Sequence, residues 1–600
     1  MFVWNHEDLS KEQEDAILHE GNVLLIACPG SGKTRTLTYK IAYELSRLES
    51  QKKYIIAITY THRAADEIKE RIELLGVDIS QLWIGTIHSF CLEWIIRPYH
   101  IYDDNLKHGY HVINSHESEE LLTELCAPYS AKKITHFDCA HIMMEGGYKL
   151  ASANQWKHAD IVSILTKYWE ILNERKQIDF EMILAYANSL LTQNQFISAT
   201  LAKIFSFLLI DEYQDTREIQ YQIFSKIFRK NRENLKAFIV GDPNQAIYTS
   251  LGGYAIQKNE LEEMTGCVFS ELSLSGNYRS SALVIDYFDH FKTYTNTIIG
   301  CGVNKDYLST ISFNNHVLKA DLDDEIVRLI LLNVNDRLIS PNEICIVAPQ
   351  WVHLASLTRR LMIKLPDLSF NGPGMAPFAR DIDNFFYKLC RIVLTEPSPH
   401  MYVSRMRWAG EILHDLNHYG LHTNNITKKE LLRLANSVVS QEQDGISYLK
   451  YFFDEIFRKA KINFWPFESL SNQYRSFFKS SEERIAKLVK EGGDYISTTE
   501  NFKKVFKQRE GITISTIHGV KGAEFNTVIA FALLEGYVPH FSDPQQIESA
   551  KKLLYVISSR ARQNLHLISE RGRLKPYGTP PDEYMTTTQL QLYAYNYLIC

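Results

Sequence analysis

The sequence predicts an α/β protein with two parallel-sheet cores, each carrying a mostly helical insertion. Continuous apolar runs of strand length alternate with segments of helical periodicity, which is typical of parallel sheets covered on both faces. The runs fall into two groups, before and after residue 290. They are NVLLIAC (22–28), YIIAIT (54–59), FLLID (207–211), AFIVGD (237–242), EICIVAP (343–349), ITIST (512–516) and NTVIAFAL (526–533).

Helical segments follow several of these strands. After the first strand, apolar residues recur at the spacing that places them on one helix face. These residues are Leu37, Ile41, Leu45 and Leu48. Near the C-terminus, Asp543 and Pro544 are typical of an N-cap and a first helical residue, and we expect this helix to run through KKLLYVISSRAR (551–562).

Two mostly helical stretches interrupt the alternation, and the second closes on Gly492 and Gly493, which are typical of a helix stop. We therefore expect each core to carry one insertion. The predicted parts are a first core of residues 1–90 and 201–290 with the insertion 91–200, and a second core of residues 291–384 and 499–600 with the insertion 385–498.

Composition excludes several classes of protein. The 65 Lys and Arg residues are outnumbered by 71 Asp and Glu, so a polyanion has to be bound by local basic clusters. The nine cysteines form no C-x-x-C pair, which argues against zinc ribbons and iron–sulfur clusters and favours a reducing compartment. The acidic N-terminus is unlike a signal peptide, and no run of ~18 apolar residues occurs. We expect a cytoplasmic protein without a membrane contact.

The strongest motif is CPGSGKT (28–34), which lies between an apolar strand and an amphipathic helix. Its glycines let backbone N–H groups turn toward a phosphate, and the helix N-terminus adds partial positive charge. In such a loop Lys33 contacts the β/γ-phosphates and the Thr34 hydroxyl binds Mg²⁺, although Ala27 replaces the first glycine of the strict pattern. The sequence therefore predicts a site for ATP and Mg²⁺. Its expected binding residues are Pro29, Gly30, Ser31, Gly32, Lys33, Thr34 and Arg35.

The second motif is FLLIDEYQDT (207–216), an apolar strand that ends in two adjacent carboxylates. Asp211 is suited to the shell of Mg²⁺, and Glu212 to polarising an attacking water. Paired acids alone are common on surfaces, but here they follow a phosphate-binding loop in the same chain. We therefore expect Lys33, Asp211 and Glu212 to act together in ATP hydrolysis.

ACPGSGKT and DEYQD, with an ordered series of further motifs, resemble the UvrD/Rep/PcrA-type DNA helicases of superfamily 1 over almost the whole chain. The resemblance implies two RecA-like cores and an ATP-driven helicase or translocase on single-stranded or partly duplex DNA, with 3′ to 5′ polarity. The further motifs are LSKEQEDAI (9–17), AITYTHRAADEIKER (57–71), GTIHSF (85–90), FIVGDPNQAIY (238–248), LSGNYRSS (274–281), ISTIHGVKGAEF (514–525) and YVISSRAR (555–562).

The resemblance also implies roles around the nucleotide. Gln13 would contact the adenine edge, Tyr278 would stack on the base, and Glu524 would bind the ribose. Gln245 would sense the γ-phosphate and couple it to DNA.

Two arginines would complete that site, again by resemblance. Arg279 would contact the γ-phosphate, and Arg560 would be an arginine finger from the second core. Phosphoryl transfer depends on positioning and charge stabilisation, so cations from distant segments suit an ATPase whose two cores close around the nucleotide.

The same motifs supply candidate DNA-binding residues. Single-strand binders combine phosphate-facing donors with aromatic side chains that stack on bases. Tyr60 could instead be a core aromatic, His62 a solvated loop histidine, and His518 and Lys521 residues that order a loop. The full set of candidates is Tyr60, Thr61, His62, Arg63, Thr86, His88, His518 and Lys521.

One departure from the family pattern favours an alternative function. The segment IYTSLGG (247–253) has no Trp where these helicases usually stack one on a DNA base. The alternative is an ATP-sensing, helicase-like subunit that gates a partner nuclease or other effector. Such subunits occur in anti-phage systems such as Gabija, and the segment WIGTIHSFCLEWIIRPY (83–99) resembles theirs. The chain has no nuclease motif, so a protein partner would supply cleavage. A third alternative is a P-loop ATPase that acts on RNA.

Overall fold

The computed structural model describes residues 2–598 apart from 6, 153, 250–251, 373–376, 379–383, 400, 422–425, 491–493, 507–509 and 576–581. The chain divides into two compact units, Met1–Leu322 with Ile517–Cys600, and Asp323–Thr516. The predicted fold class is confirmed, because helices cover two parallel-sheet cores. The predicted helix stop at Gly492 and Gly493 lies outside the described residues.

The first unit contains a six-stranded parallel sheet in the order β10-β1-β9-β8-β2-β3. Four of its strands were predicted from apolar runs. Along β1, alternate side chains enter two different hydrophobic clusters, so both faces of the sheet are covered. The strands are β1 (Asn22–Ala27), β2 (Tyr54–Ile58), β3 (Leu82–Gly85), β8 (Phe205–Asp211), β9 (Lys236–Gly241) and β10 (Phe269–Leu274).

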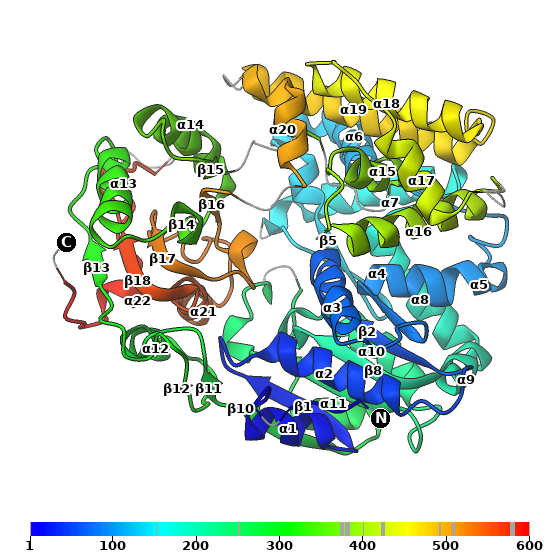
Figure 1. Ribbon diagram of the computed structural model, residues 1–600, viewed down its shortest axis with the longest axis horizontal. Helices are drawn as coiled ribbons and strands as arrows, with labels where there is room; N and C mark the ends of the chain where they lie inside the picture. The colour runs from blue at the N-terminus through cyan, green and yellow to red at the C-terminus, as the bar shows by residue number, and fades with distance from the viewer. Residues whose placement is uncertain are drawn as a thin grey trace. The chain divides into compact units, whose positions relative to one another are not determined.

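Helices α2 (Lys33–Ser46) and α3 (His62–Leu74) cover one face of this sheet (Figure 1). The predicted apolar face of α2 is confirmed for Leu37, Ile41 and Leu45, which are buried. Helix α10 (Glu218–Phe228) contributes to the cluster on the other face. Smaller helices in this part are α1 (Lys11–Leu18), α4 (Ile87–Phe90), α5 (Arg97–Tyr99) and α11 (Lys258–Thr265).

Residues 91–200 are mostly helical, as expected, and share a hydrophobic cluster with the sheet. They also form an antiparallel hairpin, β5 (His141–Met144) with β6 (Gly147–Leu150), which the sequence did not predict. The other elements are β4 (His111–Val112), α6 (Ser115–Cys126), α7 (His158–Glu174), β7 (Gln177–Ile178), α8 (Phe180–Gln193) and α9 (Gln195–Ile204).

The first unit also holds three parallel strands of the second core, in the order β13-β18-β17. Helix α12 (Ala282–Asp289) contacts both α21 and β18. These elements are β11 (Gly276–Asn277), β12 (Ile299–Gly300), β13 (Ile311–Asn314), β17 (Phe525–Ala530), α21 (Gln546–Ser558), β18 (Ala561–Ile568) and α22 (Thr588–Gln591).

The predicted bounds of the helix in this region are wrong at both ends. The carboxylate of Asp543 accepts a hydrogen bond from the backbone N–H of Gln545 at 2.8 Å, so it caps a turn before the helix. The helix therefore begins at Gln546. At the other end, Ala561 and Arg562 belong to β18 because their backbone pairs with the sheet.

The second unit contains the remaining strands of the second core, parallel in the order β14-β16-β15. Its helical part has a separate hydrophobic cluster rich in phenylalanine. The strands are β14 (Ile344–Ala348), β15 (Phe370–Asn371) and β16 (Ile512–Thr516). The helices are α13 (Leu322–Leu331), α14 (Leu354–Lys364), α15 (Phe385–Val393), α16 (Tyr402–His418), α17 (Lys428–Asn436), α18 (Gly445–Ala460), α19 (Glu468–Lys490) and α20 (Thr499–Lys504).

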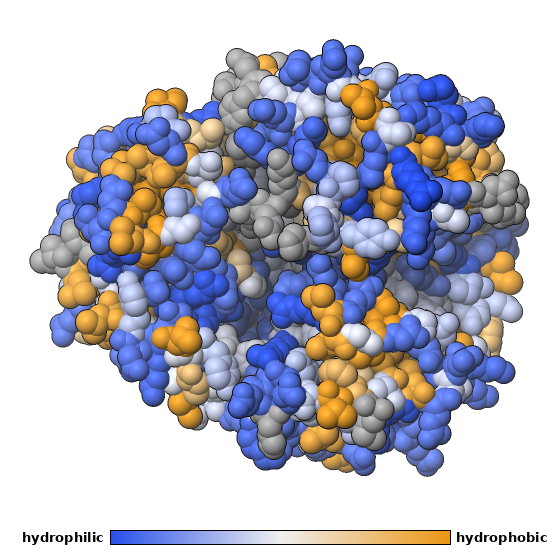
Figure 2. Space-filling model, in the orientation of Figure 1, coloured by the Kyte–Doolittle hydropathy of each residue, from blue (hydrophilic) through white to orange (hydrophobic). Residues whose placement is uncertain are grey.

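The surface is largely hydrophilic on the face shown in Figure 2, with hydrophobic side chains in separate groups. One group lies over the region of α2 and α3, where Leu74 is 81% exposed. Within the described ranges, every helix is too short or too polar to pass through a bilayer.

Candidate functional site

Most of the predicted site residues of the first core lie at one edge of its sheet. The loop of residues 28–34 follows β1, Asp211 ends β8, and Asp242 follows β9. Tyr60 lies just after β2. Because these strands are parallel, their carboxyl ends share an edge, where ligands bind in open α/β sheets.

The phosphate-binding loop owes its shape to two glycines. Gly30 and Gly32 have φ values of 69° and 77°, which glycine adopts without strain. A Cβ atom at Gly30 would lie 2.5 Å from the Cβ of Arg279, and one at Gly32 would lie 2.5 Å from Nε2 of Gln13. Lys33 then begins α2, so the loop opens directly onto a helix N-terminus. The loop therefore fits a bound phosphate.

Lys33 forms an ion pair with one of the two adjacent acids. Its Nζ lies 2.5 Å from Oε1 of Glu212. Burial alone would raise the pKa of Glu212, but Lys33 and Lys521 outweigh it and lower that pKa to about 2. Burial, and then the charge of Glu212, raise the pKa of Asp211 to about 7. The two carboxyls are thus separated in acidity, a division typical of sites with distinct roles for two acids.

Glu212 is held in place by its neighbours. Its φ of 53° is left-handed, a conformation that costs a non-glycine residue ~1–3 kcal/mol and is found at functional sites. The side-chain amide of Gln214 donates to Oε2 of Glu212 at 2.5 Å and accepts from the backbone N–H of Asp242 at 3.0 Å. Gln214 therefore joins the ends of β8 and β9.

Gln245 lies in the turn after β9 and links Asp242 to Arg560. Its Nε2 donates to Oδ2 of Asp242 at 2.8 Å, and its Oε1 accepts from Nη2 of Arg560 at 2.7 Å. Asp242 is fully buried, and its pKa is raised by burial. It also accepts a hydrogen bond from the hydroxyl of Tyr555 at 3.4 Å.

Arg560 is only 2% exposed, and burial, followed by the charge of Arg279, lowers its pKa to about 9. A buried guanidinium is unfavourable unless it is paired. An additional anion beside Arg560 would therefore stabilise it. Its recorded hydrogen-bond acceptors within the described part of the chain are neutral groups of Gln245, Ala523, Val556 and Ser559.

A second group of charges surrounds Glu524. Nε of Arg279 lies 2.5 Å from Oε2 of Glu524, and Nη2 of Arg562 lies 2.8 Å from Oε1. Burial would raise the pKa of Glu524, but the two arginines lower it to about 2. Arg279 also donates to the backbone oxygen of Ser559 at 3.0 Å. One carboxylate shared by two guanidinium groups leaves local positive charge.

Two residues expected at the nucleotide base are attached to the phosphate-binding loop. Nε2 of Gln13 donates to the backbone oxygen of Ser31 at 2.8 Å, and its Oε1 accepts from the backbone N–H of Ser10 at 2.9 Å. The backbone N–H of Tyr278 donates to the oxygen of Gly30 at 2.9 Å, while its side chain is 44% exposed. The ring of Tyr278 is therefore accessible.

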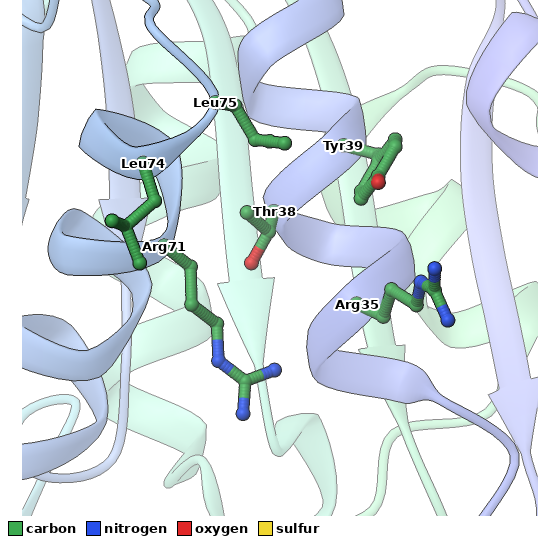
Figure 3. A pocket seen from close by; sticks show the side chains of 6 residues that line it. All are labelled: Arg35, Thr38, Tyr39, Arg71, Leu74 and Leu75. Atoms are coloured by element: carbon green, nitrogen blue, oxygen red, sulfur yellow. The ribbon is translucent and has the colours of Figure 1, made fainter. Parts of the chain in front are cut away.

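Arg35 lines a hollow of about 350 Å³ formed by α2 and α3 (Figure 3). Its guanidinium lies 5.9 Å from the ring centroid of Tyr39 and 3.6 Å from Oδ1 of Asp8. The Arg71 side chain extends from α3 toward the bottom of the view, whereas the Arg35 side chain extends from α2 away from α3. The lining of the hollow comprises Arg35, Thr38, Tyr39, Arg71, Leu74 and Leu75.

The DNA-binding candidates include one exposed aromatic. Tyr60 is 45% exposed, so its interpretation as a core residue is wrong. Its ring lies 5.0 Å from that of Tyr248, which in turn lies 5.1 Å from His518. Burial lowers the pKa of His518. Tyr60 and Tyr248 form what we call the aromatic surface. Ser250 and Leu251 of the segment without Trp lie outside the described residues.

Other DNA-binding candidates are engaged in local structure. The hydroxyl of Thr61 caps α3 by accepting from Ala64, and that of Thr86 caps α4. His62 and Arg63 lie in the first turn of α3. The ring of His88 lies 5.6 Å from that of Phe180.

Lys521 differs from these candidates because its side chain is only 9% exposed. Its Nζ lies 2.5 Å from Oδ2 of Asp215, and burial raises the pKa of Asp215 to about 6 despite this pairing.

The sequence interpretation missed Asp215, Gln214, Asp242 and Tyr248. A signal existed for Asp242, because it directly follows an apolar strand of the same sheet, as Asp211 ends another.

Within the described part of the chain, no group of three or more His, Cys, Asp or Glu side chains is placed to hold a metal ion by itself. The predicted metal ligands were Thr34 and Asp211. Mg²⁺ is usually held by one or two protein oxygen groups together with phosphates, and Thr34 in the first turn of α2 and Asp211 at the end of β8 carry groups of that kind.

Comparisons with known proteins cover nearly the whole chain. Residues 9–257 match the UvrD/REP helicase N-terminal domain, and residues 205–572 match the UvrD-like helicase C-terminal domain. The ATP-dependent DNA helicase Rep of Buchnera aphidicola subsp. Schizaphis graminum is 24% identical over 657 residues, covering 96% of both chains.

Two further relatives match about half of the chain. The ATP-dependent DNA helicase SRS2 of Saccharomyces cerevisiae is 29% identical, covering 47% of this chain and 27% of that protein. The ATP-dependent DNA helicase PcrA of Staphylococcus aureus (strain Mu50) is 27% identical, covering 47% of this chain and 39% of that protein.

Proposed function

Because the chain belongs to the UvrD-like helicase family, we propose that it uses ATP hydrolysis to move along single-stranded DNA, with 3′ to 5′ polarity, and to separate duplex strands ahead of it. We further propose that it acts in the cytoplasm. ATP hydrolysis, the first part of the proposal, is supported best by a continuous set of side-chain contacts. These contacts run from Lys33 through Glu212 and Gln214 to Asp242, Gln245 and Arg560.

ATP and Mg²⁺ would be held by the loop of residues 28–34, with Thr34 and Asp211 beside the metal. When bound, they supply a transferable phosphoryl group whose negative charge the metal partly neutralises. Glu212, fixed by Lys33 and Gln214, would orient the attacking water and accept its proton. Its lowered pKa keeps it ionised near neutral pH.

Arg279 and Arg560 would stabilise the charge that develops during transfer. Both bring positive charge from segments far from residues 28–34 in sequence, and the hydrogen-bond acceptors of Arg560 among the described residues are neutral groups. Gln245 contacts Arg560, so a shift of Arg560 on nucleotide binding or hydrolysis would move the turn after β9 that carries Gln245.

DNA bases would stack on the aromatic surface of Tyr60 and Tyr248. An aromatic side chain suits any base, because every base presents a π-face. The segment IYTSLGG (247–253) lacks the Trp that UvrD/Rep/PcrA-type helicases usually stack on a base, but it contains Tyr248. Tyr248 therefore offers an aromatic stacking group in that segment.

The experiment is steady-state ATP hydrolysis by the full chain with and without a single-stranded DNA oligonucleotide, with Lys33→Ala as the blank. Stimulation by DNA, followed by displacement of a strand from a duplex with a 3′ but not a 5′ single-stranded tail, is the expected result. Stronger stimulation by RNA of the same sequence would redirect the assignment to an RNA-dependent ATPase.

The missing Trp favours one second candidate, an ATP-sensing subunit that gates a partner nuclease or other effector. If the protein hydrolyses ATP at a rate that neither DNA nor RNA changes, the ATP-sensing subunit is favoured over the DNA translocase. In that case the next measurement is whether the nucleotide state controls binding of a partner protein.

A further inference from the structure

Lys521 makes internal contacts that do not suit a residue facing DNA. Its ammonium donates to Oδ2 of Asp215 at 2.5 Å and to the backbone oxygen of Gln245 at 2.8 Å. It also lies 5.3 Å from the ring centroid of Tyr248. The side chains of Lys521 and Asp215 are 9% and 0% exposed. The ammonium is therefore committed to three groups of the protein.

These three groups belong to segments with different tasks in the proposed function. The backbone N–H of Asp215 donates to the oxygen of Glu212 at 2.9 Å, so Asp215 closes the turn that holds the proposed base. Gln245 contacts Arg560 through its side chain. Tyr248 forms the aromatic surface with Tyr60. Lys521 thus contacts the turn that carries Glu212 and Asp215, the turn that carries Gln245, and the aromatic surface.

We propose that Lys521 is a positioning residue which, through its buried ion pair with Asp215, couples the aromatic surface to the turns that carry Glu212 and Gln245. This inference rests on the proposed DNA-dependent ATP hydrolysis. A base stacked against Tyr248 displaces a ring that lies against the ammonium. Because a buried ammonium is strongly unfavourable without its partners, the turns at Asp215 and Gln245 follow the displacement rather than separate from Lys521.

The ion pair has room for a second arrangement. Oδ1 of Asp215 is buried and has no hydrogen-bond partner among the residues that the structure describes. The ammonium can therefore pass from one carboxylate oxygen to the other without losing its counter-charge. Such a shift supplies the two discrete arrangements that coupling between neighbouring sites requires.

The test compares wild type with the double variant Lys521→Met/Asp215→Asn, which removes both charges and leaves no unpaired buried ion. Two quantities are measured on the full chain: the ratio of kcat with saturating oligonucleotide to kcat without it, and the dependence of oligonucleotide affinity on salt. We expect the ratio to fall by ~5-fold or more, within the usual range of coupling between sites. The slope of log affinity against log salt is expected to stay at the wild-type value.

Two further variants separate coupling from folding. Lys521→Arg keeps the charge and is expected to retain more of the stimulation than the double variant. Lys157→Met/Asp138→Asn removes a similarly buried lysine pair, at 2.9 Å, from the helical insertion and is expected to keep the full ratio. Thermal unfolding of all variants shows whether each is folded at the assay temperature.

Three outcomes would overturn the inference. A slope shallower by ~0.7 in the double variant means that Lys521 contacts a DNA phosphate. An unchanged stimulation ratio means that the ion pair transmits nothing. An equal loss in the Lys157→Met/Asp138→Asn control means that the effect is general destabilisation. If DNA does not change kcat of the wild-type enzyme, the proposed function itself is wrong. That failure is distinguishable from failure of this inference, because it is measured on the wild type before any variant is compared.

Discussion

Around Lys33 the charged side chains are paired with one another at the end of the sheet, whereas around Tyr60 the accessible group is aromatic and the Lys521–Asp215 ion pair is buried. In the first region Lys33, Glu212, Gln214 and Asp242 already form a connected network. In the second, Tyr60 is exposed while Lys521 is buried against Asp215.

The difference reflects what each region would bind. A phosphate group has fixed geometry, so its site gains from donors and charges that are positioned in advance. A single strand has varied bases and a flexible backbone, so stacking on an accessible ring tolerates any sequence. Variants of the first region should therefore change turnover, and variants of the aromatic surface should change DNA affinity.

The largest effect is expected for Lys33→Ala. Removing the ammonium takes away the cation nearest Glu212 and the loop, so kcat for ATP should fall by more than ~10³-fold. Steady-state hydrolysis measures it, with Lys11→Ala as a control because Lys11 lies on the surface. Retention of more than about a tenth of wild-type turnover would contradict the assignment of residues 28–34 as the phosphate site.

Arg560→Ala should lower kcat by about 10³-fold while ATP affinity stays near that of wild type, because an arginine finger acts on the charge of the transition state. Turnover and nucleotide binding are measured separately, and Arg571→Ala serves as an exposed arginine control. Equal loss of binding and turnover would show that Arg560 supports the fold of α21 and β18 instead.

Tyr60→Ala should weaken binding of a single-stranded oligonucleotide by roughly 1–3 kcal/mol, the usual contribution of one stacked base. Fluorescence anisotropy at fixed salt measures it. Tyr60→Phe keeps the ring and should bind as wild type does, and Tyr254→Ala removes another exposed tyrosine as a control. A comparable loss in Tyr254→Ala would mean that stacking is not confined to the aromatic surface.

The smallest effect is expected for Glu524→Gln in the pH dependence of stability. The pKa of Glu524 is lowered to about 2, so its ion pairs stabilise the fold above the ordinary glutamate pKa and are lost as pH falls toward 2. The melting temperature of the variant should therefore lie below that of wild type at pH 7, and the gap should narrow toward pH 3. Glu442→Gln is the exposed control, and a gap that widens in acid would reverse the assigned sign.

Short-range patterns were enough for much of the fold and for the glycine-containing loop of residues 28–34. The strands at 22–27, 54–58, 205–211 and 236–241 and the buried face of α2 follow from local hydrophobic pattern. The ends of the last predicted helix could not be obtained this way, because Ala561 and Arg562 are drawn into β18 by pairing with β17. The β5–β6 hairpin is different, because it is local: its two-residue turn contains Gly146 at φ 79°, a hairpin signal that the sequence interpretation missed.

The sequence by itself determined the strand segments of the two cores, the loop around Gly30 and Gly32 and the adjacent acids, because each depends on residues close together in the chain. Only the tertiary structure decided that Lys521 pairs with Asp215, across 306 positions, and that Arg560 contacts Gln245, across 315. The physical reason is that burial and counter-charges come from distant segments. A lysine after a strand looks alike in sequence whether its ammonium meets water, a phosphate or a buried carboxylate.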